Sequence, residues 1–332
     1  MKIPIERAKE MLTKIFKSSG ATETDIATIV SMACDQNYFC NRFSGFSKSE
    51  IEFYLKHLKN SIGINEEVVV DRPSVKLIDG KGKSACLIGM KMVDLVSEMA
   101  KKQGIGMVGL YNSTYHNILE TYTRKIAEKN LIGIVTVNGG PASVVPYGGS
   151  QPIFGTNPIS YAFPSEDLPV VFDGATAEFA YGSIRLAREN GQKLKDQTYL
   201  DKDGKFTTDP NQAIALIPFG GGYKGYAINL MIDIMTGIMV RAKSGLKVKT
   251  ESDLGGLFVA IDPSIFVSIE DFKKEVSELI QDTEEVKPLT GFTKVSIPGF
   301  KAGNAKKKMM KEGIIEINDE EWDVFEKIYK SV

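Results

Sequence analysis

The first sixty residues carry apolar positions three and four apart, which is the pattern of amphipathic helices. Helices are predicted over residues 5–16 and 24–39. A third helix is predicted to begin at Ser47-Lys48-Ser49-Glu50, because this spacing is that of a capping box, in which two side chains satisfy free N–H groups at the helix start. This part of the chain is therefore expected to form a helical lobe.

From residue 67 onward, short runs rich in β-branched residues alternate with apolar-striped helical segments. Strands are predicted over residues 67–72 and 75–79, separated by the Arg72-Pro73 breaker. The next predicted elements are a helix over 85–103, a strand over 107–111, a helix over 117–129 and a strand over 132–138. Strand, helix and strand at this spacing predict crossover units packed on a sheet.

The rest of the chain continues this mixture without an internal repeat or a low-complexity linker. The predicted elements are strands over 159–163, 169–172 and 257–261, a turn at 201–204, a buried helix over 223–240, a helix opened by Ser268, and a last helix over 320–329 capped by Asn318. The sequence therefore predicts an α/β protein whose lobes share several chain crossings.

Composition and charge limit the possible functions. The 332 residues are 42% hydrophobic and 25% charged, which is the profile of a protein that is folded throughout. The formal net charge of -1 gives no reason to expect a broad nucleic-acid or membrane surface. Residues 1–10 lack the apolar core of a signal peptide, and Asn229 and Asp233 interrupt the most apolar later stretch. We expect a cytoplasmic protein without a membrane or nucleic-acid partner.

Cysteines and histidines are too few for a disulfide framework or a histidine-rich metal centre. Cys34, Cys40 and Cys86 are an odd number at unhelpful spacing, and the only histidines are His57 and His116. Reduced, mostly buried thiols and no metal site are expected.

Two glycine-rich segments resemble phosphate-binding motifs. Gly104-Ile105-Gly106-Met107-Val108-Gly109 matches the dinucleotide fingerprint letter by letter, but that fingerprint needs a strand before it and a helix after it, and the predicted order here is the reverse. The segment Gly220-Gly221-Gly222-Tyr223-Lys224-Gly225 is better placed, because a glycine-rich turn entering a helix exposes N–H groups and Lys224 adds a positive charge suited to phosphate. A tight loop with a surface lysine remains the alternative.

Polar turns follow the strand predicted over 132–138. They are Asn138-Gly139-Gly140-Pro141, Pro146-Tyr147-Gly148-Gly149 and Gly155-Thr156-Asn157-Pro158. Loops at strand ends are where α/β proteins place ligands. Taken alone, these segments are interpreted equally well as ligand-binding loops or as plain turns.

The ordered set of motifs is more specific than any single motif. Besides the polar turns and the second glycine cluster, it contains Asn112-Ser113-Thr114-Tyr115-His116, Asp173-Gly174-Ala175-Thr176 and Asp201-Lys202-Asp203-Gly204. In this order and spacing the chain resembles the malate/L-lactate dehydrogenase type 2 family, which includes ureidoglycolate, sulfolactate, diketogulonate and cyclic-imine oxidoreductases. The resemblance is densest from about Gly104 to Gly237 and is traceable at Ile297-Pro298-Gly299.

The resemblance implies a helical lobe and a mixed-sheet lobe with flanking helices, unlike the classical Rossmann fold, and homodimers with active sites between lobes. The helical lobe is assigned to 1–70 and about 220–285, and the mixed-sheet, cofactor-binding lobe to about 71–219 and 286–332. The implied cofactor is NAD or NADP. The residues expected to bind it are Asn138, Thr156, Asn157, Phe172, Asp173, Gly174, Ala175, Thr176, Lys224, Gly225, Pro298 and Gly299.

The sequence departs from the family pattern where the chemistry is expected. The family's proton donor and acceptor is a histidine in a Ser-His-Gly triplet, just before the third helix, and residues 41–50 supply no histidine in any register. The second family histidine falls on Tyr115 by spacing, with His116 one place later. Loss of a general acid typically costs about 10²- to 10⁴-fold in rate, so the departure bears directly on activity.

Four residues are candidates for the missing proton transfer: His116, Tyr115, Lys48 and Asp173. His116 is preferred because it follows the Asn112-Ser113 motif, although a loop histidine without a role is the alternative. His57 is expected to be a partly exposed structural residue.

The leading hypothesis is a nicotinamide-dependent oxidoreductase with a rebuilt proton relay, acting on a small 2-keto or 2-hydroxy acid or a related carbonyl or imine. One alternative is a catalytically silent nucleotide- or metabolite-binding homologue. The other is a family scaffold that binds a sugar or carboxylate without a cofactor.

Overall fold

The computed structural model describes residues 1–39 and 45–332, which are organised around a seven-stranded sheet. The strand order is β2-β3-β4-β10-β5-β6-β7, in which β3 and β4 are parallel and the other neighbours are antiparallel. The strands are β1 (Lys2–Pro4), β2 (Glu67–Asp71), β3 (Val75–Asp79), β4 (Ile105–Ser113), β5 (Ile132–Val137), β6 (Ile159–Phe163), β7 (Val170–Gly174), β8 (Tyr199–Leu200), β9 (Ala215–Leu216), β10 (Leu254–Ile261) and β11 (Ile314–Glu316). A mixed sheet with this order confirms the predicted fold class and differs from the largely parallel Rossmann sheet.

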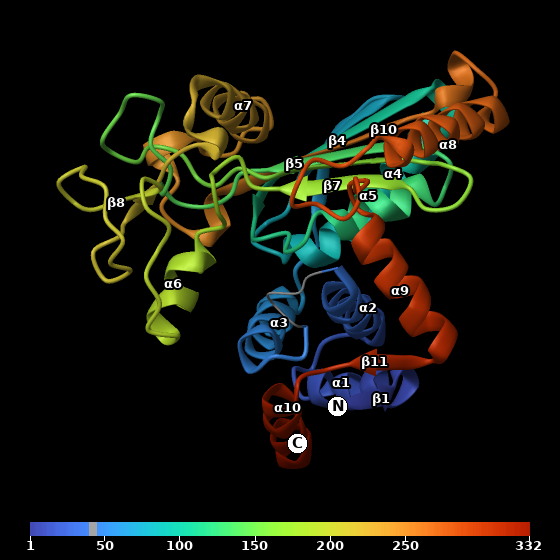
Figure 1. Ribbon diagram of the computed structural model, residues 1–332. Coiled ribbons are helices and arrows are strands. Elements are labelled where there is room, and N and C mark those ends of the chain that lie inside the picture. Colours follow the sequence, from blue (N-terminus) through green and yellow to red (C-terminus); the bar gives the residue numbers. More distant parts are fainter. Residues whose placement is uncertain (40–44) are drawn as a thin grey trace.

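Helices cover the sheet and form a second lobe beside it (Figure 1). The helices are α1 (Ile5–Lys17), α2 (Glu23–Phe39), α3 (Lys48–Ser61), α4 (Ala85–Gln103), α5 (Glu120–Ala127), α6 (Gly182–Glu189), α7 (Tyr223–Asp233), α8 (Ile269–Glu285), α9 (Phe300–Glu312) and α10 (Asp319–Ser331). α4 and α5 pack on the face of the sheet that is turned toward α2. One hydrophobic core therefore runs from the helical lobe through α4 and α5 into the sheet.

Both ends of the chain contribute to the helical lobe. α1, α2 and α3 pack with α10, and β1 pairs with β11 in a small antiparallel sheet. The predicted cap at Asn318 is confirmed, because Asn318 Oδ1 accepts the N–H of Glu321 at the start of α10. Of the predicted capping box at the start of α3, only the bond from the Glu50 N–H to Ser47 Oγ is formed.

The structure corrects the predicted division into lobes. Residues 220–285 were assigned to the helical lobe, but they include β10, which lies in the sheet between β4 and β5. An apolar strand such as β10 buries both of its faces only inside a sheet that is covered on each side. Residues 286–332 were assigned to the sheet lobe, but α9 packs on α2, and α10 packs on α1 because the Trp322 and Phe325 side chains complete its core.

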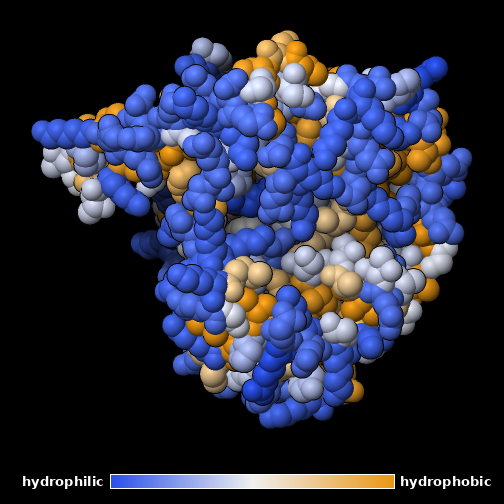
Figure 2. Space-filling model, turned by 90° about the vertical axis from the view of Figure 1, so that its right-hand side faces the viewer, coloured by the Kyte–Doolittle hydropathy of each residue, from blue (hydrophilic) through white to orange (hydrophobic). Residues whose placement is uncertain are grey.

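The helix predicted to be buried over 223–240 is shorter and more exposed than expected. α7 ends at Asp233 and continues as a π-helical segment, Ile234–Ile238, and one side of this stretch is exposed. Tyr223 is 62% exposed and Ile238 is 65% exposed, and beyond β10 the exposed fraction of Phe266 is 87%. Figure 2, which views the side carrying α8 and α9, shows further apolar side chains among the polar ones.

The segment from Gly104 to Gly109, which matches the dinucleotide fingerprint, lies where a helix ends and a strand begins, as predicted. α4 ends at Gln103, Gly104 adopts a left-handed φ of 84° as its C-cap, and β4 begins at Ile105. Across the described residues, 1–39 and 45–332, no helix combines the length and apolarity needed to cross a membrane.

Candidate active site

A chain of adjoining pockets runs from α9, past the ends of β7 and β6, to the helical lobe. The outer pocket has a volume of about 330 Å³ and lies between β7 and α9. The main pocket, of about 1040 Å³, shares Glu120, Phe172 and Asp173 with it. The inner pocket has two halves that share Glu50, Tyr115 and Thr156, and one of these halves shares Asn117 and Ile118 with the main pocket. The three pockets together are called the cleft below.

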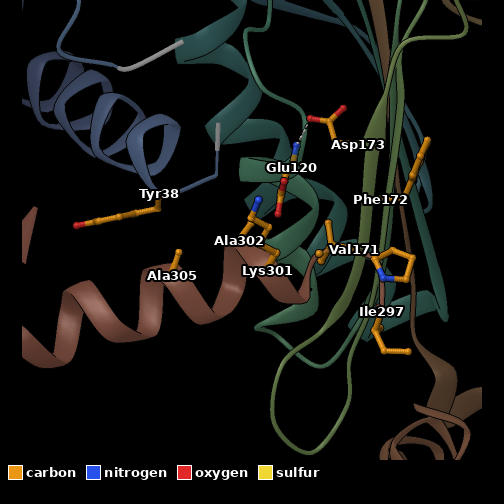
Figure 3. Close-up of a pocket in the computed structure, with 11 residues that line it drawn as sticks. Tyr38, Glu120, Val171, Phe172, Asp173, Ile297, Lys301, Ala302 and Ala305 are labelled. Carbon is orange, nitrogen blue, oxygen red and sulfur yellow. Dashed lines mark hydrogen bonds between the residues drawn. The ribbon is translucent and has the colours of Figure 1, made fainter. Parts of the chain in front are cut away.

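The outer pocket joins residues that are distant in the sequence. Figure 3 shows Phe172 and Asp173 of β7 opposite Lys301 of α9, with Tyr38 of α2 on the far side. The N–H of Val171 donates to the Pro298 carbonyl at 3.1 Å, which ties β7 to the start of α9. Phe172, Asp173, Pro298 and Gly299, all expected to bind the cofactor, therefore line one pocket, and their role in binding stays a prediction.

Gly299 is required for this close approach. Its φ of 81° is in the left-handed region, and a Cβ atom there would lie 2.8 Å from Val171 and 3.0 Å from Arg124 Nη2. The Arg124 guanidinium donates to the Gly299 carbonyl at 2.7 Å and pairs with Glu120. The glycine thus brings the α9 N-terminus against the sheet.

Asp173 occupies the junction between the outer and main pockets. Its Oδ2 accepts the N–H of Glu120 at 2.9 Å, which caps α5 (Figure 3). Burial raises the pKa of Asp173 to about 7, the nearby Glu120 carboxylate acts in the same direction, and the hydrogen bonds from the Glu120 and Leu119 N–H groups oppose it. This carboxyl group can exchange a proton near neutral pH.

The main pocket has largely apolar walls with a flat aromatic surface. Phe172 is exposed and stacks on Tyr161, with ring centroids 5.5 Å apart. Gly174, Ala175 and Thr176 also line this pocket. Thr176 is itself buried, and its hydroxyl donates to the Asn157 carbonyl at 2.8 Å.

Asn138 and Asn157 belong to a buried polar network. Asn157 is 0% exposed, and its Nδ2 donates to Asn229 Oδ1 at 3.0 Å, while its Oδ1 accepts the N–H of Gly139 at 2.9 Å. Asn138 and Asn157 both donate to Asp233 Oδ1. These bonds hold α7 against the ends of β5 and β6, so the two asparagines shape the polar loops. Asn138 and Thr156 also line the inner pocket, whereas Asn157 does not.

Lys224 and Gly225 lie beside the cleft. Lys224 is exposed in the first turn of α7 and is not among the residues that line the three pockets. Gly225 is buried, and a Cβ atom there would lie 2.3 Å from the carbonyl oxygen of Phe219. Phe219 and Gly220 line the main pocket, so Gly225 sets the position of the turn that forms part of its wall.

The four candidate proton donors are placed very differently. Asp173 and Tyr115 line the cleft, and burial raises the pKa of Tyr115. The Lys48 side chain is 66% exposed and pairs with Glu52 on the outside of α3. His116 contributes to the wall of the inner pocket, but its imidazole is enclosed in the core.

The surroundings of His116 explain its character. It is 2% exposed, its ring packs against Tyr122 and Phe258, and its Nε2 has no hydrogen-bond partner among the described residues. A Cβ atom on Gly256 would lie 2.8 Å from Nε2, so the ring fills the space that this glycine leaves. Burial lowers the pKa of His116 to about 3, so the imidazole is neutral at pH 7.

His57 is also buried, which corrects the expectation of partial exposure. Its Nδ1 lies 3.3 Å from Thr114 Oγ1, and burial lowers its pKa to about 4. Cys34 and Cys86 are buried free thiols. Cys40 and residues 41–44, where the family histidine is expected, lie outside the described residues.

Four polar residues at the inner end of the cleft were not selected from the sequence. Glu50 and Asn117 line the inner pocket in both halves, Gln36 lines one half, and Tyr54 bonds to Gln36 and Asn117. Glu50 had been interpreted only as part of the α3 capping box. The unused signal was that Glu50 lies beside the segment that lacks the expected histidine.

Comparisons with known proteins agree with this architecture. The family model for malate/L-lactate dehydrogenase matches residues 3–326. The malate/(S)-sulfolactate dehydrogenase of Methanothermus fervidus is 36% identical over 325 residues, covering 95% of this chain and 93% of the relative. The NAD(+) ureidoglycolate dehydrogenase of Escherichia coli is 31% identical over 246 residues, covering 72% of this chain and 69% of the relative. The structure of sulfolactate dehydrogenase from Methanocaldococcus jannaschii has a TM-score of 0.86 at 30% identity, covering 100% of this chain and 97% of that one.

Proposed function

Because the chain belongs to the malate/L-lactate dehydrogenase family, we propose that it is an NAD- or NADP-dependent oxidoreductase. Its substrate is a small 2-keto or 2-hydroxy acid, or a related carbonyl or imine. The observation that carries the proposal is the cleft, in which Phe172, Asp173 and Gly299 line one pocket and the buried carboxyl of Asp173, whose pKa is raised, also lines a large, mainly apolar pocket. When bound, the nicotinamide supplies or accepts a hydride.

The residues of the cleft fit a dinucleotide. The exposed ring of Phe172 offers a face on which a planar base can stack. Gly174 and Gly299 leave room for close approach, since a Cβ atom at either position would lie within 2.8 Å of a neighbouring side chain. Lys301 and the N-terminus of α9 adjoin the outer pocket, where they suit a phosphate.

Proton transfer to or from the substrate requires a group that lines the cleft. Asp173 and Tyr115 satisfy this condition and remain proposed participants. The enclosed ring of His116 and the outward position of Lys48 argue against either as the direct proton donor. Asp173 also orients α5 through its bond to Glu120, so its role includes positioning.

The protein is further proposed to form a homodimer. Large apolar side chains are exposed at Ile238 and Met239 after α7, and at Phe266, Leu289 and Phe292 around α8. Exposed apolar patches on soluble proteins mark interaction sites. Light scattering at micromolar concentration should give twice the chain mass, and a monomer there would contradict this part of the proposal.

The direct test of the function is ligand-dependent stability. NADH or NADPH should raise the melting temperature, because a ligand selective for the native state stabilises it by about 2.7 kcal/mol at a hundredfold excess over Kd. Phe172→Ala should reduce this shift, whereas Phe292→Ala, which removes an exposed ring outside the cleft, should retain it. No shift at millimolar concentrations of either dinucleotide would contradict the proposal and favour a scaffold that binds without a cofactor.

A further inference from the structure

We propose that Glu50 exchanges the substrate proton in the inner pocket, and that Arg185 binds the substrate carboxylate across the same pocket. The inference rests on the proposed function, because it assumes a dinucleotide in the neighbouring main pocket. It assigns to a carboxyl group the task that the family gives to a histidine.

The position of Glu50 supports this role. It lies in the first turn of α3, and its side chain lines both halves of the inner pocket together with Tyr115, Asn117 and Thr156. Its own N–H completes half of the capping box by donating to Ser47 Oγ at 3.4 Å. Among the hydrogen bonds of the described residues, none joins the Glu50 carboxyl to the Ser47 N–H, so the carboxyl is free to serve the pocket.

A buried network holds the groups around Glu50. The Tyr54 hydroxyl donates to Gln36 Oε1 at 2.9 Å, and Asn117 Nδ2 donates to the Tyr54 oxygen at 2.6 Å and to Gln36 Oε1 at 3.3 Å. Because the Gln36 oxygen is occupied by these donors, its NH₂ group is left to donate elsewhere. The Gln36 and Asn117 side chains line the same pocket as Glu50 and act to lower the pKa of its carboxyl group, so the surroundings of Glu50 are set by α2 and by the loop after β4.

Burial of Glu50 favours proton exchange, and the groups around it moderate the effect. Burial raises the pKa of Glu50, and the Gln36 hydrogen bond, the charge of Arg185 and the Asn117 hydrogen bond act in the opposite direction. The other titratable groups near it are Tyr54 on α3 and Cys86 on α4, whose pKa values are raised mainly by burial and further by the Glu50 charge, and Tyr115, which lines the same pocket. A raised carboxyl pKa brings an acid closer to the pH at which it works best.

Arg185 gives the inner pocket its cation. It lies on α6 beside Tyr181 and lines the same half of the pocket as Glu50 and Gln36. A guanidinium binds a carboxylate through two parallel N–H···O bonds, which fixes both position and orientation. A 2-keto or 2-imino acid bound in this way turns its neighbouring carbonyl or imine toward Glu50.

The proposed step balances in atoms and electrons. A dinucleotide in the main pocket would supply the hydride that adds to the substrate carbon during reduction, and the electron pair of the C=O π bond would move to oxygen. The O–H bond of Glu50 breaks as the substrate O–H bond forms, and the resulting carboxylate regains its proton from water. In the oxidation direction Glu50 accepts the hydroxyl proton.

The test compares Glu50→Gln with Glu52→Gln, which removes an exposed carboxylate two residues along the same helix. With NADH and NADPH each supplied, and pyruvate, oxaloacetate and glyoxylate as probes, Glu50→Gln should lower kcat/KM by about 10²- to 10⁴-fold. Dinucleotide binding should be unchanged, and Glu52→Gln should resemble the wild type. Full turnover by Glu50→Gln would overturn the proton assignment.

A second measurement does not depend on turnover. Because folding raises the pKa of Glu50, the contribution of Glu50 to wild-type stability falls as pH rises above about 4. Glu50→Gln lacks this loss, so its urea midpoint should rise relative to that of the wild type with increasing pH. A parallel pair of pH profiles would contradict the proposed environment of Glu50.

The Arg185 assignment is tested by binding of oxamate, a 2-keto acid analogue, to the dinucleotide complex. Arg185→Met should weaken oxamate binding at least tenfold, while Arg188→Met, on the same helix but bonded to the Pro210 carbonyl, should not. Wild-type affinity in Arg185→Met would overturn the assignment. If the wild type binds neither dinucleotide, the proposed function fails, whereas dinucleotide binding with unaffected variants refutes only this inference.

Discussion

Replacing Asp173 by Asn should change the pH dependence of stability in a defined direction. Asn keeps an oxygen that can accept the Glu120 N–H, so the cap on α5 is preserved while the ionisable group is removed. The pKa of Asp173 rises from 3.8 to about 7 on folding because the carboxylate loses solvation. That difference corresponds to about 4 kcal/mol at 1.36 kcal/mol per pH unit, and the partial exposure of the side chain reduces it to roughly 2 kcal/mol.

The sign follows from proton binding. Between about pH 4 and pH 7 the folded protein holds a proton on Asp173 that the unfolded chain releases, so the contribution of Asp173 to the free energy of unfolding falls as pH rises through this window. Above about pH 7 both states are ionised at this position and the dependence on Asp173 ends. Asp173→Asn should therefore gain stability relative to the wild type from pH 4 to pH 7 and then remain parallel to it.

Urea denaturation from pH 4.5 to pH 8 measures this difference. Asp167→Asn is the matched control, because Asp167 is an exposed aspartate before β7 that pairs with Lys307 at the surface. The free energy of unfolding of Asp167→Asn should not rise with pH relative to that of the wild type, as that of Asp173→Asn should. Equal slopes for the wild type and Asp173→Asn would refute the assignment of a raised pKa to this carboxyl.

Three further substitutions test other parts of the structure. Gly299→Ala should lower the free energy of unfolding by about 1 to 3 kcal/mol and weaken dinucleotide binding, because residue 299 has a left-handed φ and an added Cβ would lie against Val171. Gly313→Ala is the control, since residue 313 has a φ of 66° and nothing within 4 Å of an added Cβ. It should cost less stability and leave dinucleotide binding unchanged in the same urea and binding titrations. Asn157→Ala should lower the free energy of unfolding, measured by urea denaturation, by about 1 to 3 kcal/mol, because it leaves buried hydrogen-bond partners unsatisfied. Asn211→Ala, at an exposed position, should have little effect. Equal losses in the two variants would contradict the buried hydrogen-bond network of Asn157. His116→Met should retain turnover, and a strong loss of kcat would restore His116 as the proton donor. Burial lowers the pKa of His116 to about 3, so the wild type loses stability through this residue as pH falls below about 6.5, and His116→Met should lose less.

The sequence predicted those elements in which local pattern and tertiary packing agree. The helix predicted over 85–103 and the strand predicted over 159–163 are found with the same bounds, because an apolar stripe in one and alternation in the other match their burial. α6 and α9 were missed because α6 spans only eight residues and α9 is rich in lysine. The lobe division failed because the chain crosses between lobes more often than linear segments suggest.

The candidate site was predicted in part. The family resemblance assigns Phe172, Asp173 and Pro298-Gly299 to cofactor binding, and the fold places them around one pocket although they are far apart along the chain. Their binding of a cofactor stays a prediction. It could not show that His116 turns into the space above Gly256, since a one-residue difference in a loop changes side-chain direction. Glu50 was overlooked because its capping spacing gave it a sufficient local explanation, and only the fold places it beside Gln36 and Asn117.

The central claim is that this protein transfers a hydride between a nicotinamide and a small substrate. The most direct measurement uses NADH and NADPH deuterated at either face of C4, with pyruvate, oxaloacetate, glyoxylate and a cyclic imine carboxylate, and mass spectrometry of the products. We expect one deuterium in the reduced product, delivered from one face only, at a rate that falls in Glu50→Gln. Dinucleotide binding without deuterium transfer to any of these substrates would contradict the account and identify the chain as a silent binding homologue.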